Sequence, residues 1–407
     1  MAAARCPRIL LADADAFFVA VARLVDPEGA GRAECLIVGG ARDSRGVVCS
    51  ASYEARRFGV RSAMSIAQAR RLCPQATFVP VPRKACGQKS AEIRAVLQRY
   101  APVVEGASVD EWYLDLSGTE GVYHDEPLEA TAQRIRTAVR ESTGLTLSIG
   151  GGTNKLIAKL AVDRAKPRTD PQSTGVVIVP AGHETEFLRT CTLAEIPGVG
   201  PKAQARLASR GLITVPDLLA QDLAGLRRWL GHRHATWLWN RAHGVDEAAV
   251  VSRGANKGIS RDETFNHDLE ADRDIERELF GLVSRAASDM RGSQLAARTI
   301  AVKLRDWDFQ TRSAQRTLPE AVTADRVIMA VARELLDELR HFRRVPARLV
   351  GVRLSTLVSL SAADQLNLFA GNASTNETAR DLALTRAVDG VRRRFGDSSI
   401  LPARLTD

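Results

Sequence analysis

The chain has 407 residues, 45% of them hydrophobic, and its 57 lysines and arginines exceed its 48 aspartates and glutamates to give a formal net charge of +9. This length is too great for one hydrophobic core and predicts about two to four domains. The positive charge suits a polyanionic partner, but many cytosolic proteins are basic, so it favours nucleic acid only weakly.

The six cysteines argue against a disulfide-stapled or zinc-binding protein. They are widely and irregularly spaced and form no Cys-x-x-Cys pair, so we expect reduced thiols. The N-terminus lacks a long apolar segment, and no run approaches the roughly 18 apolar residues of a membrane span. We therefore expect a soluble, cytoplasmic protein that does not bind membranes.

The first predicted element is an apolar strand over residues 8–15, which ends in the carboxylates of Asp13 and Asp15. A second strand is predicted at 35–38, followed by a small α/β insertion that closes near residues 80–82. Acids at the end of a strand are common on solvated edges, but they are also suitable ligands for a hard cation.

A second acidic site follows the apolar residues 102–104. Ser108-Val109-Asp110-Glu111-Trp112 places two adjacent carboxylates just before a predicted strand at 113–116. Two neighbouring acids cannot both be buried without a cation to neutralise them. We therefore predict that Asp13, Asp110 and Glu111 share one divalent metal site.

The elements around these acids alternate between helix and strand. Helices are predicted at 90–100, at 128–142 and from 153, and a further strand at 145–149. Strands alternating with helices around an antiparallel pair are typical of a split βαβ sheet, in which the acidic ends of two strands can meet at one edge.

Residues 171–245 are predicted to be mostly helical. They contain a Pro-Gly-x-Gly turn, with Gly198 and Gly200, that precedes Lys202 and opens a helix capped by Gly211. Amides at such a helix start can bind phosphate, and the alternative is an ordinary turn between two helices.

After residue 258 the pattern becomes a βαββαβ unit, with strands at 259–265, 299–305, 311–318 and 347–355 and helices at 273–290 and 324–339. In the strand 299–305, apolar residues alternate with a face that carries Lys303 and Arg305. That face is either simply solvated or in contact with a nucleic-acid backbone.

The chain from residue 359 onward is polar, apart from an apolar cluster at 365–369. An apolar cluster in such a tail either docks on another protein or folds back on its own chain. A basic helix that includes residues 392–394 follows, and its simplest interpretation is a solvated face.

Four blocks of sequence then occur in a fixed order: Asp-x-Asp-x-Phe-Phe at 13–18, SYEARRFGVRSAM at 52–64, SVDExYLD at 108–115, and SIGGGTNKxxAKxA at 148–161. In this order and spacing the chain resembles the Y-family translesion DNA polymerases, of the bacterial DinB or DNA polymerase IV type. The resemblance covers residues 8 to about 356, and a motif in the tail extends it.

The resemblance implies an α+β multidomain fold shaped like a right hand. It predicts a split βαβ palm at 1–16 and 83–170, small fingers at 17–82, and a helical thumb with a helix-hairpin-helix at 171–245. A linker at 246–256, a βαββαβ little finger at 257–357 and a tail at 358–407 complete the prediction.

The resemblance also implies the reaction, a template-directed transfer of deoxynucleotides to a primer 3′-hydroxyl with two Mg²⁺ ions, or Mn²⁺, in the active site. Asp13 and Asp110 would bridge both ions, Glu111 would bind the catalytic ion, and the Ala14 carbonyl would complete the nucleotide-side ion. Partners would be primer-template DNA and deoxynucleoside triphosphates, with the DNA contacted through Gly198, Gly200, Lys202, Lys303 and Arg305.

Residues of the fingers and palm would form the nucleotide pocket. By resemblance, the triphosphate is bound by Ser50, Tyr53, Arg56 and Lys159, and the sugar lies over Phe18, a steric gate against ribose. Phe17 is grouped with the pocket, although by itself it is predicted to be a core aromatic. The small residues Cys49 and Ala63 would leave the roof over the nascent base pair open to damaged bases.

No acid cluster outside the palm resembles an exonuclease, so we expect low fidelity without proofreading, in translesion synthesis and DNA repair. The tail resembles the peptide that bacterial polymerases insert into the sliding clamp, with Gln365, Leu366, Leu368 and Phe369 as contacts, on an otherwise monomeric protein. Trp112 and Ala16 depart from the usual family residues, which leaves the lesion spectrum open.

Two other functions compete with a polymerase. One is a noncatalytic, clamp-docking, DNA-binding scaffold of a mutagenesis complex, which is expected to lack the three acids. The other is a palm-type nucleotide cyclase, which explains neither the Pro-Gly-x-Gly turn nor the clamp-like tail.

Overall fold

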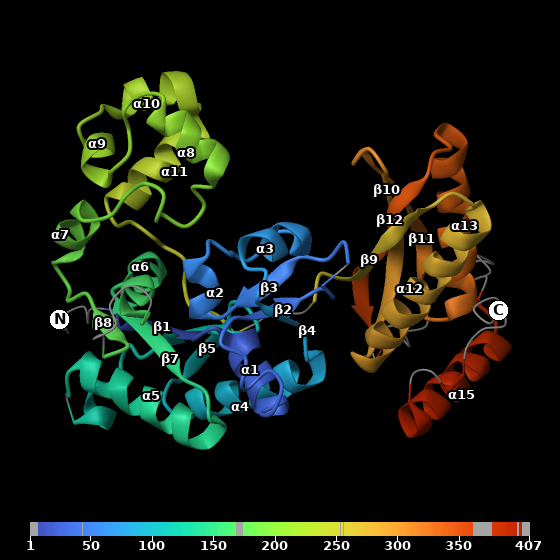
Figure 1. The fold of residues 1–407 in the computed structure, drawn as a ribbon, viewed down its shortest axis with the longest axis horizontal. Coiled ribbons are helices and arrows are strands. Elements are labelled where there is room, and N and C mark those ends of the chain that lie inside the picture. Colours follow the sequence, from blue (N-terminus) through green and yellow to red (C-terminus); the bar gives the residue numbers. More distant parts are fainter. Residues whose placement is uncertain are drawn as a thin grey trace, which may run out of the picture. The chain divides into compact units, whose positions relative to one another are not determined.

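The computed structural model describes residues 7–42, 44–124, 126–167, 174–252, 254, 256–360, 377–396 and 399–400. The chain divides into two compact units, Met1–Gly254 and Ala255–Asp407 (Figure 1). Within the described ranges, no helix is long and apolar enough to cross a membrane.

The central sheet of the first unit has five strands in the order β5-β6-β1-β7-β8. Their bounds are β1 Ile9–Ala14, β5 Val103–Gly106, β6 Glu111–Asp115, β7 Leu147–Gly152 and β8 Val176–Ile178. β1 lies between β6 and β7 and is antiparallel to both. All of its residues are buried, which explains why β1 is an apolar run rather than an alternating pattern.

Helices cover both faces of this sheet (Figure 1). α1 (Phe17–Val25), α4 (Arg83–Leu97) and α5 (Leu128–Thr143) share a core with one face, and α6 (Lys155–Ala165) packs on the other. α6 approaches β7 so closely that a Cβ at Gly150 would lie 2.1 Å from the backbone nitrogen of Val162. A glycine is therefore required where the sheet meets α6, the helix that carries Lys159.

β8 lies in the region that the sequence predicts to be mostly helical. It pairs in parallel with β7, and Val176 joins the core beneath the sheet. A three-residue strand is too short to show a periodic pattern, so only its pairing reveals it. A short 3₁₀ helix, η1 (Glu120–Tyr123), lies between β6 and α5.

A smaller sheet in the order β3-β2-β4 forms the α/β insertion that the sequence predicts after α1. Its elements are β2 Leu36–Gly39, β3 Val48–Ala51, α2 Tyr53–Arg57, α3 Ile66–Leu72 and β4 Thr77–Pro80. Ser52 and Ser65 cap α2 and α3 by accepting hydrogen bonds from backbone N–H groups of the first turn. These caps explain why both helices begin where they do.

Five helices follow β8 and share one core with a face of α6. They are α7 Glu184–Arg189, α8 Pro201–Ala208, α9 Val215–Leu219, α10 Leu223–Leu230 and α11 His232–Ala242. The turn before α8 needs glycine, because Gly198 has φ +100° and a Cβ there would lie 2.9 Å from the Trp237 ring.

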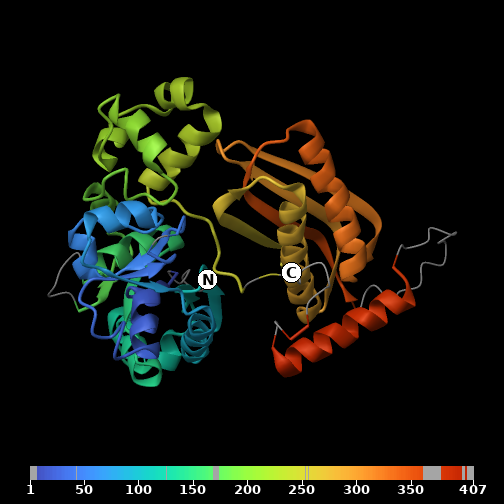
Figure 2. The ribbon, with the colours of Figure 1, turned by 45° about the vertical axis from the view of Figure 1, so that its right-hand side comes forward.

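The second unit is a four-stranded antiparallel sheet in the order β11-β10-β12-β9, and its helices α12 and α13 share a core with one face (Figure 2). The bounds are β9 Gly258–Leu269, α12 Asp272–Gly292, β10 Leu295–Asp306, β11 Thr311–Val322, α13 Asp325–Phe342 and β12 Ala347–Ser359. This is the predicted βαββαβ order. β9 and β12 extend beyond their predicted ends through partly or fully exposed residues, where the hydrophobic alternation fades.

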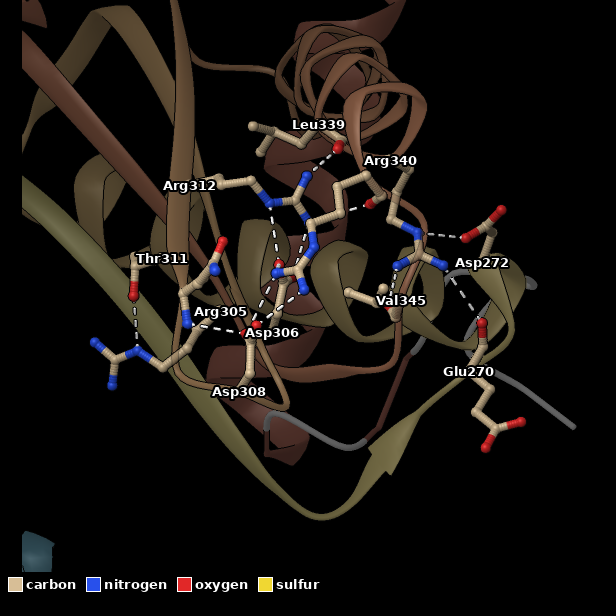
Figure 3. A network of polar contacts seen from close by, with 12 residues as sticks. Glu270, Asp272, Arg305, Asp306, Asp308, Thr311, Arg312, Leu339, Arg340 and Val345 are labelled. Atoms are coloured by element: carbon tan, nitrogen blue, oxygen red, sulfur yellow. Dashed lines mark hydrogen bonds and ion pairs between the residues drawn. The ribbon is translucent and has the colours of Figure 1, made fainter.

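One end of this sheet is closed by a buried ion network (Figure 3). Asp306, at the end of β10, is fully buried and accepts hydrogen bonds from Arg312 and Arg343, each at 2.7 Å. Arg343 also pairs with Asp308, so the β10–β11 turn is tied to the residue that follows α13. Removing one partner of such a network would leave an uncompensated buried charge.

The last described helix, α15 (Ala379–Phe395), attaches to the second unit largely through polar pairs. Asp381 pairs with Arg326, and Asp389 pairs with Arg291. Arg392 is only 9% exposed and donates to Ser284 Oγ at 2.9 Å. The prediction of a solvated basic face is therefore wrong for Arg392, because its guanidinium contacts α12, a distant segment that the local sequence does not indicate.

Candidate active site

Three acids lie together at one edge of the central sheet. Asp13 on β1 is the register partner of Glu111 on β6, and the backbone N–H of Ala14 donates to the carbonyl of Asp110 at 2.9 Å. The antiparallel pairing of β1 with β6 thus brings together residues almost 100 positions apart. Asp13 is buried, whereas Asp110 and Glu111 are partly exposed.

Two lysines neutralise these acids. Lys159 Nζ lies 2.5 Å from Glu111 Oε1 and 3.8 Å from Asp13 Oδ2. Lys166 Nζ lies 2.7 Å from Asp13 Oδ2. Lys166 is absent from the predicted site residues, and it lies just after the end of α6, as an extended C-cap residue, so helical periodicity does not place it with Lys159.

Burial and the lysines together shift the pKa values of Asp13 and Glu111 in opposite directions. Burial raises the pKa of Asp13 to about 7, and Lys166 only partly offsets that rise. Burial also opposes ionisation of Glu111, but the hydrogen bond and charge of Lys159 outweigh it and hold the pKa of Glu111 below its ordinary value. Two carboxylates this close cannot both ionise easily unless more positive charge enters the site.

The donor set fits a hard divalent cation, which binds carboxylate and carbonyl oxygens. As the side chains stand, however, no three acids, histidines or cysteines of the described residues are grouped tightly enough to hold a metal ion. Asp110 accepts a hydrogen bond from Ser108 Oγ, and Asp13 accepts one from Lys166 Nζ. A rotation of Asp110 and release of the lysines would complete the ligand set.

The predicted phosphate-binding residues of the insertion lie on α2 and β3. The Arg56 guanidinium lies 5.1 Å from the centre of the Tyr53 ring and donates to the Ala51 carbonyl at 2.9 Å. Ser50 is buried in β3. Arg56 is therefore held in a defined position by both its stacking partner and the backbone.

The two phenylalanines at the start of α1 differ in burial. Phe17 is 2% exposed and belongs to the core beneath the central sheet, whereas Phe18 is half-buried. Their rings meet edge to face with centres 5.5 Å apart. Ala16, just before them, has a left-handed backbone with φ 45°, which is unusual for a non-glycine residue.

The remaining predicted residues lie elsewhere. Gly198, Gly200 and Lys202 form the turn and first residues of α8. Lys303 pairs with Asp262, and Arg305 donates to Thr311 Oγ1 at 2.8 Å, both from β10 side chains that alternate with the buried ones. The predicted clamp contacts Gln365, Leu366, Leu368 and Phe369 fall outside the described residues.

Matches to protein families cover most of the chain. Residues 12–163 match the impB/mucB/samB family, 256–368 match the C-terminal domain of that family, and 194–246 match the thumb domain of DNA polymerase iota. DNA polymerase IV of Desulfatibacillum aliphaticivorans is 36% identical over 98% of this chain and 96% of its own length. DNA polymerase IV of Halorhodospira halophila is 37% identical over 86% of this chain and 95% of its own length.

The chain belongs to the Y-family DNA polymerases. DinB from Sulfolobus solfataricus, a solved structure, is 26% identical with a TM-score of 0.58 over 86% of this chain and 98% of its own. A solved chimera of the Y-family polymerases Dbh and Dpo4 has a TM-score of 0.72 at 23% identity, over 86% of this chain and 99% of its own, and this likeness shows the fold alone. The predicted family and the α+β polymerase fold are confirmed.

Membership of the Y family gives the enzyme class, a DNA-directed DNA polymerase. The prediction of an enzyme is therefore confirmed, and the noncatalytic scaffold and the cyclase lose their support. The candidate site residue that the sequence interpretation missed is Lys166, whose contact with Asp13 depends on how α6 packs over β1.

Proposed function

We propose that this Y-family polymerase catalyses template-directed DNA synthesis at Asp13, Asp110 and Glu111, by nucleotidyl transfer with two divalent cations. The observation that carries this proposal is the pairing of buried Asp13 with partly exposed Glu111, with Lys159 and Lys166 against them. In the reaction the primer 3′-hydroxyl gives up its proton to solvent and its oxygen bonds to the α-phosphorus of the nucleotide, while the bond from that phosphorus to the α,β-bridging oxygen breaks and pyrophosphate leaves. When bound, the cations lower the pKa of the primer hydroxyl and stabilise the charge on the triphosphate.

The chain's own residues supply the framework for that step. Asp13 and Asp110 would hold both cations, the Ala14 carbonyl would complete the nucleotide-side ion, and Glu111 would hold the ion nearest the primer. Mg²⁺ is the expected ion, with Mn²⁺ as a substitute. The bound proton implied by the raised pKa of Asp13 must leave before this carboxylate can act as a ligand.

Lys159 and Lys166 would also contact the substrate. In the structure, their ammonium groups neutralise the acids that the cations would otherwise neutralise. Lys159 and Lys166 would also compensate the charge of the triphosphate. Arg56, placed by the Tyr53 ring and the Ala51 carbonyl, would grip the same phosphates bidentately.

Three further residues of the nucleotide pocket would govern sugar selection and tolerance of damaged bases. We propose that Phe18 underlies the deoxyribose and excludes a ribose 2′-hydroxyl. Cys49 is exposed on β3, and Ala63 is held near it by a hydrogen bond from its backbone N–H to the Val48 carbonyl. Two such small side chains would leave room for distorted bases, in keeping with low-fidelity translesion synthesis and DNA repair without proofreading.

We further assign the parts of the hand. The central sheet would be the palm, the small sheet the fingers, α7 to α11 the thumb, and residues 257–357 of the second unit the little finger. The thumb would bind the DNA backbone at Gly198, Gly200 and Lys202, and the little finger would bind it with Lys303 and Arg305. The tail residues Gln365 to Phe369 would dock on the sliding clamp.

Primer extension tests the proposed site. With Mg²⁺, deoxynucleotides and a primed template, the wild type should extend the primer, and Asp110→Ala should not. Asp115→Asn is the matched control, because Asp115 lies at the other end of β6 and accepts a hydrogen bond from Ser117. Full activity of Asp110→Ala would place catalysis elsewhere, and inactivity of the wild type would refute the activity itself.

A further inference from the structure

The segment that follows α11 lies against the central sheet before the chain enters the second unit. We call residues 244–251 the strap. At its start, the Gly244 carbonyl accepts a hydrogen bond from Asn154 Nδ2 at 2.8 Å. Two residues later, the nearly buried side chain of Asp246 pairs with Arg241 at 2.8 Å. The beginning of the strap is therefore fastened to both α6 and α11.

The far end of the strap is fastened as well. Val250 is 7% exposed and belongs to a small apolar cluster with Ile9 and Leu11 of β1 and with residues of α6. Next to it, the backbone N–H of Val251 donates to Glu105 Oε2 at 2.9 Å. Glu105 is on β5, 146 positions earlier in the chain. The strap thus ends on a side chain of the central sheet.

Glu105 is itself held in place. Lys155 Nζ contacts both of its carboxylate oxygens, at 2.7 and 2.8 Å, and both side chains are largely buried. The same ammonium lies 4.5 Å from the centre of the Tyr113 ring. A partly buried, charge-assisted pair of this kind is stronger than a surface pair and orients the oxygen that receives Val251.

This arrangement shortens the connection to the second unit. Between Val251 and the start of β9 at Gly258 only six residues remain, 252–257, which can span at most about 20 Å. If the strap were released as far back as the Asp246–Arg241 pair, the connection would contain 11 residues, 247–257. Longer tethers lower the effective concentration of the tethered part roughly as the −3/2 power of their length.

We propose that Glu105 is a positioning residue: it anchors the strap to the palm and thereby sets the length of the tether that delivers the second unit to DNA. The inference rests on the proposed DNA contact of that unit. Lengthening the free segment from six to 11 residues predicts an increase of about 2.5-fold in the dissociation constant for primer-template DNA. Nucleotide incorporation at saturating DNA should not change, because Glu105 contacts neither the three acids nor the two lysines that face them.

The test combines hydrogen exchange with kinetics on the full chain. In Glu105→Ala, the amides of 247–251 should exchange faster, the DNA dissociation constant should rise about 2.5-fold, and the incorporation rate at saturating DNA should stay within twofold of wild type. Glu92→Ala is the matched control, since it removes an exposed pair with Lys89 at 2.8 Å from the same unit. It should change none of the three quantities.

A second variant separates tether length from any folding defect. Five Gly/Ser residues inserted after Gly254 in the wild type should raise the DNA dissociation constant as Glu105→Ala does, while exchange in the strap stays slow. Unchanged strap exchange in Glu105→Ala, or unchanged DNA affinity in the insertion variant, would overturn the inference. Absence of primer extension by the wild type would refute the proposed function instead, because strap exchange is measured without DNA.

Discussion

Lys166 Nζ lies 2.7 Å from Asp13 Oδ2, and this contact joins the residue after α6 to the end of the central strand of the sheet. A lysine this close to a candidate metal ligand competes with a cation for the same oxygen. Under the proposed mechanism, Lys166 would exchange this carboxylate for the triphosphate.

Replacing this lysine should therefore weaken nucleotide use more than folding. Lys166→Met is expected to lower kcat/KM for deoxynucleotides about 10- to 100-fold, since a hydrogen bond to a charged group contributes about 1.5–3 kcal/mol. Lys166→Arg should retain more activity because it keeps the charge. Lys89→Met, at the exposed pair on α4, is the control, and an equal loss there would mean that the effect is not specific to the site.

The pKa of Asp13 predicts how the metal-free protein responds to pH. In the folded state this pKa is about 7, above its ordinary value of 3.8, so the fold retains a proton that the unfolded chain has released. The stabilisation is fully present below 3.8 and is lost as the pH rises through about 7. The free energy of unfolding in EDTA, measured by urea titration, should fall across this window in the wild type. Asp13→Asn should show a smaller fall, and an identical fall would contradict the assignment.

The close contact of α6 with β7 predicts that one added methyl group will strongly lower the stability of the fold. In Gly150→Ala the new Cβ would meet the Val162 nitrogen at 2.1 Å and the Ala158 carbonyl oxygen at 2.3 Å, both backbone atoms that cannot rotate away. We expect a loss of stability of about 3 kcal/mol or more by denaturant unfolding. Gly87→Ala in α4 meets nothing within 4 Å and should instead stabilise by about 0.5–1 kcal/mol.

The stability of the second unit should be just as sensitive to a single substitution in its buried ion network. Asp306→Asn leaves Arg312 and Arg343 without their shared carboxylate and should cost about 3–5 kcal/mol (Figure 3). Glu334→Gln, which weakens an exposed pair with Arg316, should cost less than about 1 kcal/mol. Calorimetry can separate the unfolding of the two units, and the loss should appear in the second alone. A similar cost for both variants would argue against the special role of burial.

Phe18 and Phe17 provide a paired test of sugar selection. Phe18→Ala should raise ribonucleotide incorporation relative to deoxynucleotide incorporation at least about tenfold, because the proposed clash with the 2′-hydroxyl is removed. Phe17→Leu changes a core residue that is 2% exposed, so it should lower stability without changing sugar selection. Unaltered sugar selection in Phe18→Ala would show that Phe18 is not the steric gate.

Sequence alone determined the family, the order of most elements and the adjacency of Asp110 and Glu111. Asp110 and Glu111 are neighbours in the chain, and the apolar strand before Asp13 is marked by its composition, so local pattern was sufficient. The second βαββαβ unit was visible for the same reason, because its periodicities are local.

Tertiary structure decided which distant groups meet. The contact of Lys166 with Asp13, the burial of Arg392, the pairing of β8 and the bond from Val251 to Glu105 all join segments whose sequences do not indicate one another. Such contacts depend on how the sheets close and how the helices pack over them. A lysine or a glutamate looks the same in sequence whether it faces water or a buried partner, and only packing distinguishes the two.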